Sequence, residues 1–317
     1  MDIKNILALS MIKGIGPAFI KRNISRIASD TDCYALVEEY KAEQTESVSA
    51  CLEKADKIIE DCARYGIEMI SITSPDYPNR LKEINDPPSV LFVKGNKNLL
   101  NKCIAIIGTR KSTELGNKIA EKIGEYFSKD YAICNGLVEG IDEHSIYVKG
   151  KILPNVIGII SGGLYYEDTC SKAHTKVIND VLNAGGLVIT EFYPHVKEDK
   201  FSGSKASRIQ AGLSHGLILV QSSIGGGSKY TIASFAKLGR AMAVVHYPAS
   251  KEYQDDSFSG NRIIVEKKNE GIAKMIDLKK VSRVNVKSIT VLEKKEDYTL
   301  FMRRMAEHNQ VLDLGLS

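Results

Sequence analysis

The chain has 317 residues, of which 43% are hydrophobic and 26% are charged, and its formal net charge at pH 7 is +4. These values indicate an ordinary globular protein in which one large domain accompanies one or two small ones. They exclude a membrane span, because no run of 18 apolar residues occurs, and they allow at most a local basic patch. The first residues do not form a signal peptide, so we expect a cytoplasmic protein.

Residues 1–66 are predicted to form a small helical domain. The apolar residues Ile3, Ile6, Leu7 and Met11 keep helical spacing, and Lys13-Gly-Ile-Gly-Pro17 interrupts them. Two explanations fit this turn. It is a helix-hairpin-helix, whose glycines let backbone amides approach DNA phosphate, or a plain tight turn between packed helices, which is the more common case.

Residues 67–277 are predicted to form the large domain. A first strand at 67–72 and a proline-rich connector to residue 98 lead into alternating apolar runs and helical segments. Several runs are apolar on both faces, which is typical of buried parallel strands, so we predict a Rossmann-like, doubly wound α/β sheet that is mostly parallel. The strands are expected at 103–108, 131–135, 155–160, 187–191, 216–221 and 241–246.

Residues 278–317 are charged and show little periodicity before a possible helix at 294–307. We expect a short C-terminal extension without a complete winged helix.

The strongest functional signal is the strand at 103–108, which ends abruptly in Gly108-Thr109-Arg110 before a helix. A buried parallel strand that stops at glycine before a helix leaves amide groups free to bind phosphate. Arg110 adds a permanent charge with a planar fork of donors. We therefore predict a phosphate site at this strand end.

Small residues also end the neighbouring strands, and parallel strands present these ends along one edge of a sheet. The predicted phosphate-binding residues at these ends are Gly136, Ser161, Gly162, Gly163, Gly226, Gly227 and Ser228. The glycine loop at 225–227 fits a ligand-facing loop better than a flexible surface loop, because it opens a helix directly after a buried strand.

A basic segment before the fifth strand adds Lys205 and Arg208, so that three cations including Arg110 are expected at the same edge. Phe201 either stacks on a nucleic-acid base or packs in the core beneath its loop. The sequence predicts no catalytic residue and no cofactor, because it contains no Gly-x-Gly-x-x-Gly fingerprint and no Walker A loop. Neither the six cysteines nor the six histidines have metal-ligand spacing, so no metal site or disulfide framework is expected.

Asp142 and Glu191 could form a carboxylate pair at adjacent strand ends. Structural roles are favoured for both: Asp142 as a cap of the following helix, and Glu191 as an ion-pair partner of Arg110 or Arg208.

The order of motifs resembles the DNA-processing protein A (DprA, or Smf) family over about residues 70–270. The segments that carry the resemblance are Tyr77-Pro78, Asp86-Pro87-Pro88, Ile106-Ile-Gly-Thr-Arg110, Gly136-Leu-x-x-Gly-Ile-Asp142, Glu191-x-x-Pro194, Arg208-Ile-x-Ala-Gly-Leu-Ser214, Gly227-Ser228, Gly239-Arg240 and Gly260-Asn-Arg-Ile-Ile264.

The resemblance implies a Rossmann-like domain that binds single-stranded DNA without catalysis, forms a homodimer, and loads a RecA-type recombinase during natural transformation and recombination. Arg110 corresponds to the family's phosphate-contacting arginine, and Lys205 and Arg208 lie where the family has its basic segment. A different class remains open: a small-nucleotide sensor on the same architecture. The related phosphoribohydrolase activity is disfavoured, because the loop at 225–228 lacks that family's glutamate. A scaffold whose helical N-terminal domain recruits a partner is a third possibility.

Overall fold

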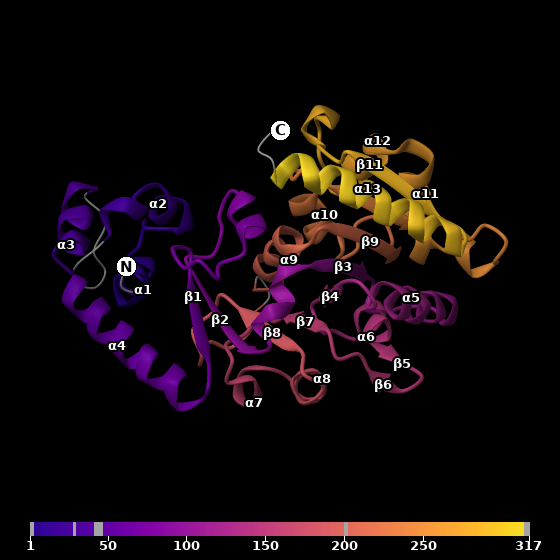
Figure 1. Ribbon diagram of the computed structural model, residues 1–317. Coiled ribbons are helices and arrows are strands. Elements are labelled where there is room, and N and C mark those ends of the chain that lie inside the picture. The colour runs from indigo at the N-terminus through magenta and orange to yellow at the C-terminus, as the bar shows by residue number, and fades with distance from the viewer. Residues whose placement is uncertain (1–2, 28–29, 41–46, 200–201, 314–317) are drawn as a thin grey trace.

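A computed structural model of the protein describes residues 3–27, 30–40, 47–199 and 202–313 (Figure 1). The helices are α1 (Ile3–Ser10), α2 (Pro17–Arg22), α3 (Asp30–Glu39), α4 (Val48–Arg64), α5 (Glu114–Phe127), α6 (Ile141–Ile146), α7 (Tyr166–Thr169), α8 (Lys172–Asn183), α9 (Ser202–Leu213), α10 (Lys229–Phe235), α11 (Ser259–Lys267), α12 (Asn269–Met275) and α13 (Lys295–Asp313). The strands are β1 (Glu68–Ser71), β2 (Val90–Gly95), β3 (Cys103–Gly108), β4 (Ala132–Asn135), β5 (Tyr147–Val148), β6 (Lys151–Ile152), β7 (Val156–Ile159), β8 (Leu187–Thr190), β9 (Gly216–Gln221), β10 (Ala241–Val245) and β11 (Ser288–Leu292).

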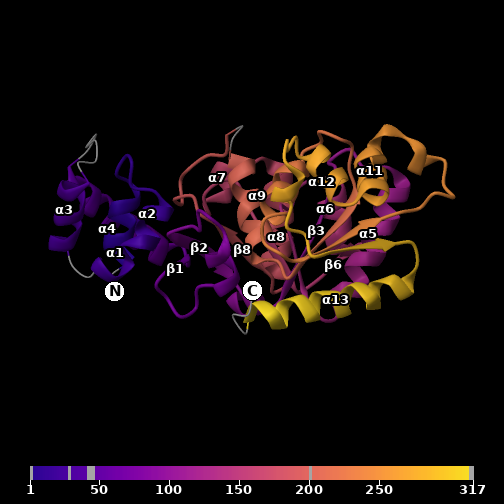
Figure 2. The same cartoon turned by 90° about the horizontal axis from the view of Figure 1, so that it is seen from above.

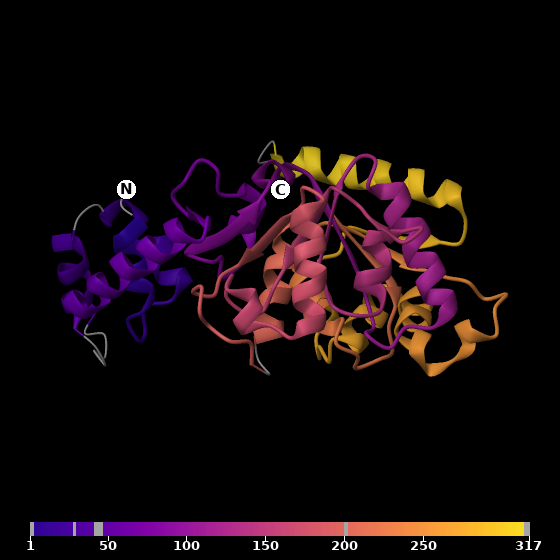
Figure 3. The ribbon, with the colours of Figure 1, turned by 90° about the horizontal axis from the view of Figure 1, so that it is seen from below.

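The four helices α1–α4 form the N-terminal part of the molecule, at one end of its long axis (Figure 3). Helix α4 begins because the Ser47 hydroxyl accepts a hydrogen bond from the amide of Ala50, and it buries an apolar face that includes Cys51 and Ala55. The turn between α1 and α2 contains Gly14 at a φ of +89°, and Pro17 opens α2.

The main sheet has nine strands in the order β1-β2-β8-β7-β4-β3-β9-β10-β11. All pairs from β8 to β11 are parallel, whereas β1 and β2 pair antiparallel with each other and β2 pairs antiparallel with β8. The order reverses beside β3, because the chain winds from β3 toward β8 in one direction and from β9 toward β11 in the other. A ligand site is expected outside the carboxyl ends of the strands at such a reversal.

Helices cover both faces of the sheet, and successive residues of β3 face opposite layers. Ile104 and Ile106 belong to the core beneath α5 and α13, with Phe127 among their neighbours. Ala105 and Ile107 belong to the core beneath α9–α12. Figure 2 shows α13 on one side of the sheet and α9, α11 and α12 on the other. The expected doubly wound, mostly parallel sheet is therefore confirmed.

The C-terminal segment departs from the sequence-based expectation. Residues 288–292 form β11, which pairs parallel with β10 from Ala241↔Ser288 to Val245↔Leu292. Helix α13 then packs back across the sheet, with Phe301 and Met305 buried. Residues 278–313 therefore complete the sheet rather than form a separate extension. The two-stranded hairpin β5–β6 is a second element that the sequence does not indicate.

Candidate nucleic-acid interface

A groove of about 540 Å³ opens at the carboxyl ends of β3, β4 and β7. Seven of the predicted site residues line it: Gly108, Thr109, Arg110, Gly136, Ser161, Gly227 and Ser228. They come from four strand ends that are far apart in the sequence, and the sheet order brings them together. We call this cavity the Arg110 groove.

Arg110 is exposed at the groove and forms no hydrogen bond or ion pair with any residue that the structure describes. The next residue, Lys111, also lines the groove and is exposed. Thr109 holds the loop in place, because its amide donates to the Gln221 carbonyl at 2.8 Å and its hydroxyl accepts from the Lys111 amide at 3.2 Å. Two uncompensated cations therefore stand on a fixed loop.

Three amides at the ends of β3 and β4 are not free, contrary to the sequence-based expectation. The amide of Thr109 is bonded to Gln221, that of Gly136 donates to Asp142 Oδ2 at 2.8 Å, and that of Lys111 is bonded to Thr109. An anion in the groove would therefore meet mainly the cationic and hydroxyl groups of side chains. The free backbone amides that strand-end glycines suggest contribute less.

Close packing against α6 requires glycine at position 108. A Cβ atom on it would lie 2.4 Å from Cγ1 of Ile141, the first residue of α6. The Ile141 amide also donates to the Thr109 carbonyl at 3.2 Å, which fixes α6 against the end of β3. A Cβ atom on Gly140, whose φ is +84°, would likewise lie 2.4 Å from the Thr109 carbonyl oxygen. The two glycines therefore allow α6 to approach the loop that presents Arg110.

Asp142 lies at the base of the groove, and burial raises the pKa of its carboxyl group to about 7. The Gly136 amide and the charge of Arg110 oppose this shift. Asp142 is the second residue of α6 and accepts from the loop before the helix, so the predicted capping role for it is replaced by one in loop stabilisation. His174, from α8, is also near: burial and the charge of Arg110 lower its pKa.

One side of the groove is formed by small and polar residues of α9, which include Ser204, Ser207 and Gln210. Gln210 is fixed because its Nε2 atom donates to the Cys134 carbonyl at 3.2 Å. On the opposite side, the Ser228 hydroxyl is buried and has no hydrogen-bond partner among the described residues. A buried hydroxyl without a partner at the surface of a groove is available to a ligand.

Arg208 does not line the groove. Its guanidinium donates to both carboxylate oxygens of Glu191 at 2.6 Å and to Asp86 Oδ2 at 2.8 Å. The favoured role of Glu191 as an ion-pair partner is therefore confirmed, and the prediction of Arg208 as a free cation beside Arg110 is wrong in this structure. Lys205 is exposed and also stands apart from the groove, with its ammonium 5.6 Å from the centre of the Phe192 ring.

Gly162, Gly163 and Gly226 are also absent from the groove lining. A Cβ atom on Gly163 would lie 2.1 Å from the Tyr193 carbonyl oxygen, so this glycine permits close packing of two loops. The neighbours of the other two are side-chain hydroxyls: a Cβ atom on Gly162 would lie 3.3 Å from Thr169 Oγ1, and one on Gly226 would lie 2.9 Å from Ser222 Oγ. Phe201, predicted to stack or to pack in the core, lies outside the described residues.

Sequence reasoning missed several residues of the groove, among them Lys111, Gln210 and Tyr230. Tyr230 has the clearest signal in the sequence, since it lies three residues after the glycine loop and is the second residue of α10. Its ring is 50% exposed, and an exposed aromatic ring beside cations is a stacking surface for a base.

A neighbouring cavity of about 1000 Å³ shares Arg110 and Ser161 with the groove, but five carboxylates contribute to its lining. Its carboxylates are those of Glu139, Glu143, Asp180, Glu198 and Asp199. These five carboxylates outnumber the two cations of the lining, Arg110 and Lys176, so this cavity suits an anion less well than the Arg110 groove does.

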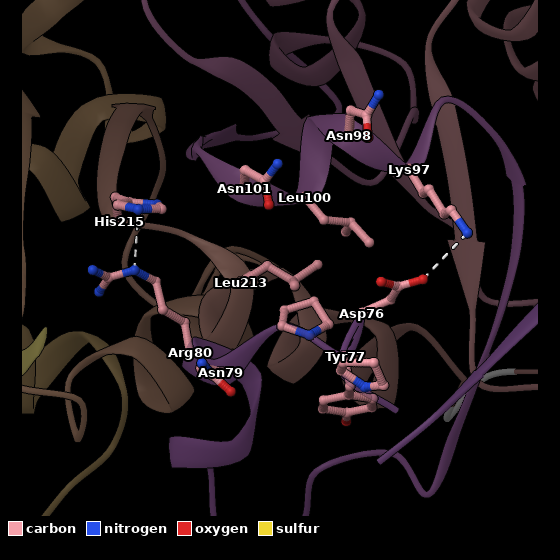
Figure 4. A pocket seen from close by; sticks show the side chains of 12 residues that line it. Asp76, Tyr77, Asn79, Arg80, Lys97, Asn98, Leu100, Asn101, Leu213 and His215 are labelled. Carbon is pink, nitrogen blue, oxygen red and sulfur yellow. Dashed lines mark hydrogen bonds and ion pairs between the residues drawn. The ribbon is translucent and has the colours of Figure 1, made fainter. Parts of the chain in front are cut away.

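Another cavity, of about 420 Å³, lies near the amino ends of β3 and β9 (Figure 4). Arg80 Nε donates to His215 Nε2 at 3.1 Å there, and the Lys97 ammonium lies 3.3 Å from Asp76 Oδ2. These polar groups bind one another and connect the proline-rich segment to the sheet. They lie at the edge opposite the Arg110 groove.

The described residues contain no group of three or more His, Cys, Asp or Glu side chains placed to hold a metal ion. Within the same residues, no helix combines the length and the apolar character needed to span a membrane.

Comparison with protein families gives a match between residues 68–281 and the model of DNA recombination-mediator protein A. DNA processing protein DprA of Bacillus subtilis is 34% identical over 197 residues, which cover 61% of this chain and 65% of that protein. DprA of Streptococcus pneumoniae is 32% identical over 171 residues, or 54% of this chain and 60% of that protein. The matches thus span slightly less than two thirds of these curated relatives.

Two solved structures resemble the fold. DprA from Streptococcus pneumoniae superposes with a TM-score of 0.66 at 21% identity and covers 94% of both chains. DNA processing protein A from Helicobacter pylori, whose structure concerns its single-stranded DNA binding mode, superposes with a TM-score of 0.54 at 22% identity, covering 63% of this chain and 87% of that chain.

Proposed function

The chain belongs to the DNA recombination-mediator protein A family, and on this premise we propose that it binds single-stranded DNA in the Arg110 groove. The observation that carries the proposal is the free guanidinium of Arg110, which stands beside Lys111 at the switch point of a doubly wound sheet.

The groove suits an unpaired strand because its groups recognise features that all nucleotides share. Arg110 and Lys111 bind phosphates, and the unpartnered hydroxyl of Ser228 donates to a phosphate oxygen. The exposed ring of Tyr230 offers a face on which any base can stack. We therefore expect binding that depends little on base sequence and excludes the stacked bases of a duplex.

Fluorescence anisotropy with oligo-dT and with duplex DNA, at two salt concentrations, tests the proposal. Two phosphate contacts predict a slope of about −1.4 for log affinity against log salt, at ~0.7 per phosphate on single strands. Equal affinity for duplex and single strand, or affinity that does not respond to salt, would contradict it.

We further propose that the protein acts in the cytoplasm as a homodimer, protects single strands and loads a RecA-type recombinase during DNA uptake and recombination. Family membership supports these roles. Sedimentation velocity tests the dimer. Strand exchange by a RecA-type recombinase on DNA coated with single-strand-binding protein, with and without this protein, tests the loading. No acceleration of strand exchange would contradict the loading role.

A non-catalytic nucleotide sensor is the second candidate, because a volume of about 540 Å³ also suits a single nucleotide. Thermal unfolding with nucleoside monophosphates distinguishes the two: a sensor is stabilised by a monophosphate, whereas a strand-binding protein requires an oligonucleotide. Release of free base in the same mixtures would reveal an enzyme.

A further inference from the structure

A second basic hollow lies beyond the Arg110 groove, between α5, α13 and the carboxyl ends of β10 and β11. Its volume is about 490 Å³, and four lysines and three tyrosines contribute to its lining. We call it the α5–α13 cavity. The family match ends at residue 281, before β11 and α13, so part of this cavity lies outside the matched segment.

The lysines of the cavity are Lys122, Lys129, Lys294 and Lys295, and all four are exposed. None of their ammonium groups forms an ion pair or hydrogen bond within the described part of the chain. Lysines elsewhere on the surface do form such pairs, as Lys118 does with Glu114. The cavity therefore gathers positive charge that the protein itself does not neutralise.

Two carboxylates also line the cavity, those of Glu125 and Glu293. Glu293 is bound by His246, whose Nδ1 lies 2.6 Å from Glu293 Oε1. Lysines therefore outnumber carboxylates by two to one at this surface, which favours an anionic occupant.

Aromatic rings make the cavity more than a charged patch. Tyr126 and Tyr298 pack edge to face with ring centres 5.0 Å apart, and the Tyr126 hydroxyl lies 3.3 Å from Thr299 Oγ1, so α5 and α13 hold these rings in place. Tyr247, after β10, is 43% exposed and can take a stacked base. Lysines beside open aromatic rings are the combination with which proteins bind unpaired nucleotides.

Helix α5 links the cavity to the Arg110 groove. The loop that presents Arg110 and Lys111 leads into α5 at Glu114, and Lys122 lies about 12 Å farther along the helix at ~1.5 Å per residue. A strand that follows α5 from the Arg110 loop therefore reaches the lining of the cavity.

We propose that the α5–α13 cavity is a second contact site for single-stranded DNA, which receives a nucleotide of the strand held in the Arg110 groove, with its base against Tyr247 and its phosphate at Lys294 and Lys295. This inference rests on the proposed function of the Arg110 groove.

Strand length separates the two sites experimentally. Affinities are measured by anisotropy for oligo-dT of about 6 and about 20 nucleotides, the first near the lower end of the site sizes of known single-strand-binding domains and the second beyond their upper end. Tyr247→Ala is expected to weaken binding of the long strand about tenfold, and Tyr247→Phe to preserve it, because phenylalanine keeps the ring. The short strand, bound in the Arg110 groove, is expected to be unaffected by either variant.

The charge contribution has its own matched control. The double variant Lys294→Ala/Lys295→Ala should reduce the salt slope for the long strand by about 1.4, at ~0.7 per phosphate contact. Lys279→Ala/Lys280→Ala removes the same charge from an exposed lysine pair outside the cavity and should leave the slope nearly unchanged. Thermal unfolding of each variant verifies that the fold is kept.

Three results would overturn the inference. One is an unchanged long-strand affinity in all cavity variants. Another is an effect of the lysines without an effect of Tyr247→Ala, which would indicate an acidic protein segment as the occupant. The third is stabilisation of the protein by thymidine monophosphate that Tyr247→Ala abolishes, with no effect on long strands, which would assign the cavity to a free nucleotide. The affinity of Arg110→Ala for the short strand tests the Arg110 groove alone. An unchanged affinity in that measurement would contradict the proposed function and is distinguishable from a failure of the cavity proposal.

Discussion

Arg208 and Glu191 form a two-pronged ion pair, in which each carboxylate oxygen accepts a hydrogen bond at 2.6 Å from one terminal nitrogen of the guanidinium. The two side chains are 12% and 15% exposed, and Asp86 occupies the remaining Nε donor. The pair joins α9 to the end of β8. Because its donors are occupied, the Arg208 guanidinium is not available to a DNA phosphate.

Arg208→Ala is therefore expected to destabilise the fold rather than the DNA complex. Removing one partner of a buried pair leaves a carboxylate without compensation, which is worth about 3–5 kcal/mol when burial is complete. Partial exposure reduces the expected loss to about 2–4 kcal/mol. Urea unfolding measures this loss, and anisotropy at a temperature where the variant is folded should give the wild-type affinity. If the variant is as stable as the wild type but no longer binds DNA, Arg208 is a DNA-contacting residue and this prediction is wrong.

Arg110→Ala is expected to weaken every oligonucleotide alike, because the proposed contact of Arg110 is with phosphate and not with base edges. The salt slope should become shallower by about 0.7. Arg283→Ala is the matched control, since Arg283 is exposed and lies outside the groove. The fold should tolerate both changes. If the two variants bind equally well, the groove is not the DNA site.

The affinity for single strands is expected to rise as the pH falls from 8 to 6. The pKa of Asp142 is about 7 in the folded protein, so its carboxylate is largely charged at pH 8 and repels phosphate from the base of the groove. Protonation removes this repulsion, and bound phosphate favours the protonated form.

Asp142→Asn tests this directly. The amide oxygen can still accept from the Gly136 amide, but the charge is gone. The variant should bind more tightly than the wild type at pH 8 and show a flatter pH profile, and the two proteins should converge toward pH 6. Anisotropy across this range measures the difference. A wild-type profile in the variant would rule out Asp142 as the titrating group.

Arg240→Lys is expected to lower the free energy of unfolding by about 3 kcal/mol or more, as for other buried charges that lose partners. Arg240 is fully buried, and its terminal nitrogens donate to the carbonyls of Gly212 at 2.8 Å and Ser214 at 2.6 Å and to Glu83 Oε2 at 2.7 Å. A lysine has no planar fork and cannot reach these acceptors together. Urea unfolding measures the effect, and a variant as stable as the wild type would contradict it.

The sequence is sufficient to predict the sheet and the position of the groove, because buried parallel strands read as continuous apolar runs and their carboxyl ends share an edge. It does not predict β11, since Ser288–Leu292 is half-exposed at the sheet edge and alternates instead of forming such a run. The pairing of Arg208 with Asp86 joins residues that only the folded chain brings together. The same is true of the bond from the Thr109 amide to the Gln221 carbonyl, which occupies an amide that the local pattern leaves free.

The hydrogen bonds of the buried Arg240 guanidinium affect how fast a ligand can enter the Arg110 groove. Arg240 binds the last carbonyls of α9, and α9 supplies Ser204, Ser207 and Gln210 to one side of the groove. We therefore expect an incoming strand to meet a groove wall that is already ordered, so that little ordering entropy opposes association. Arrival should then be governed by diffusion and charge attraction instead of by a slow rearrangement of the protein.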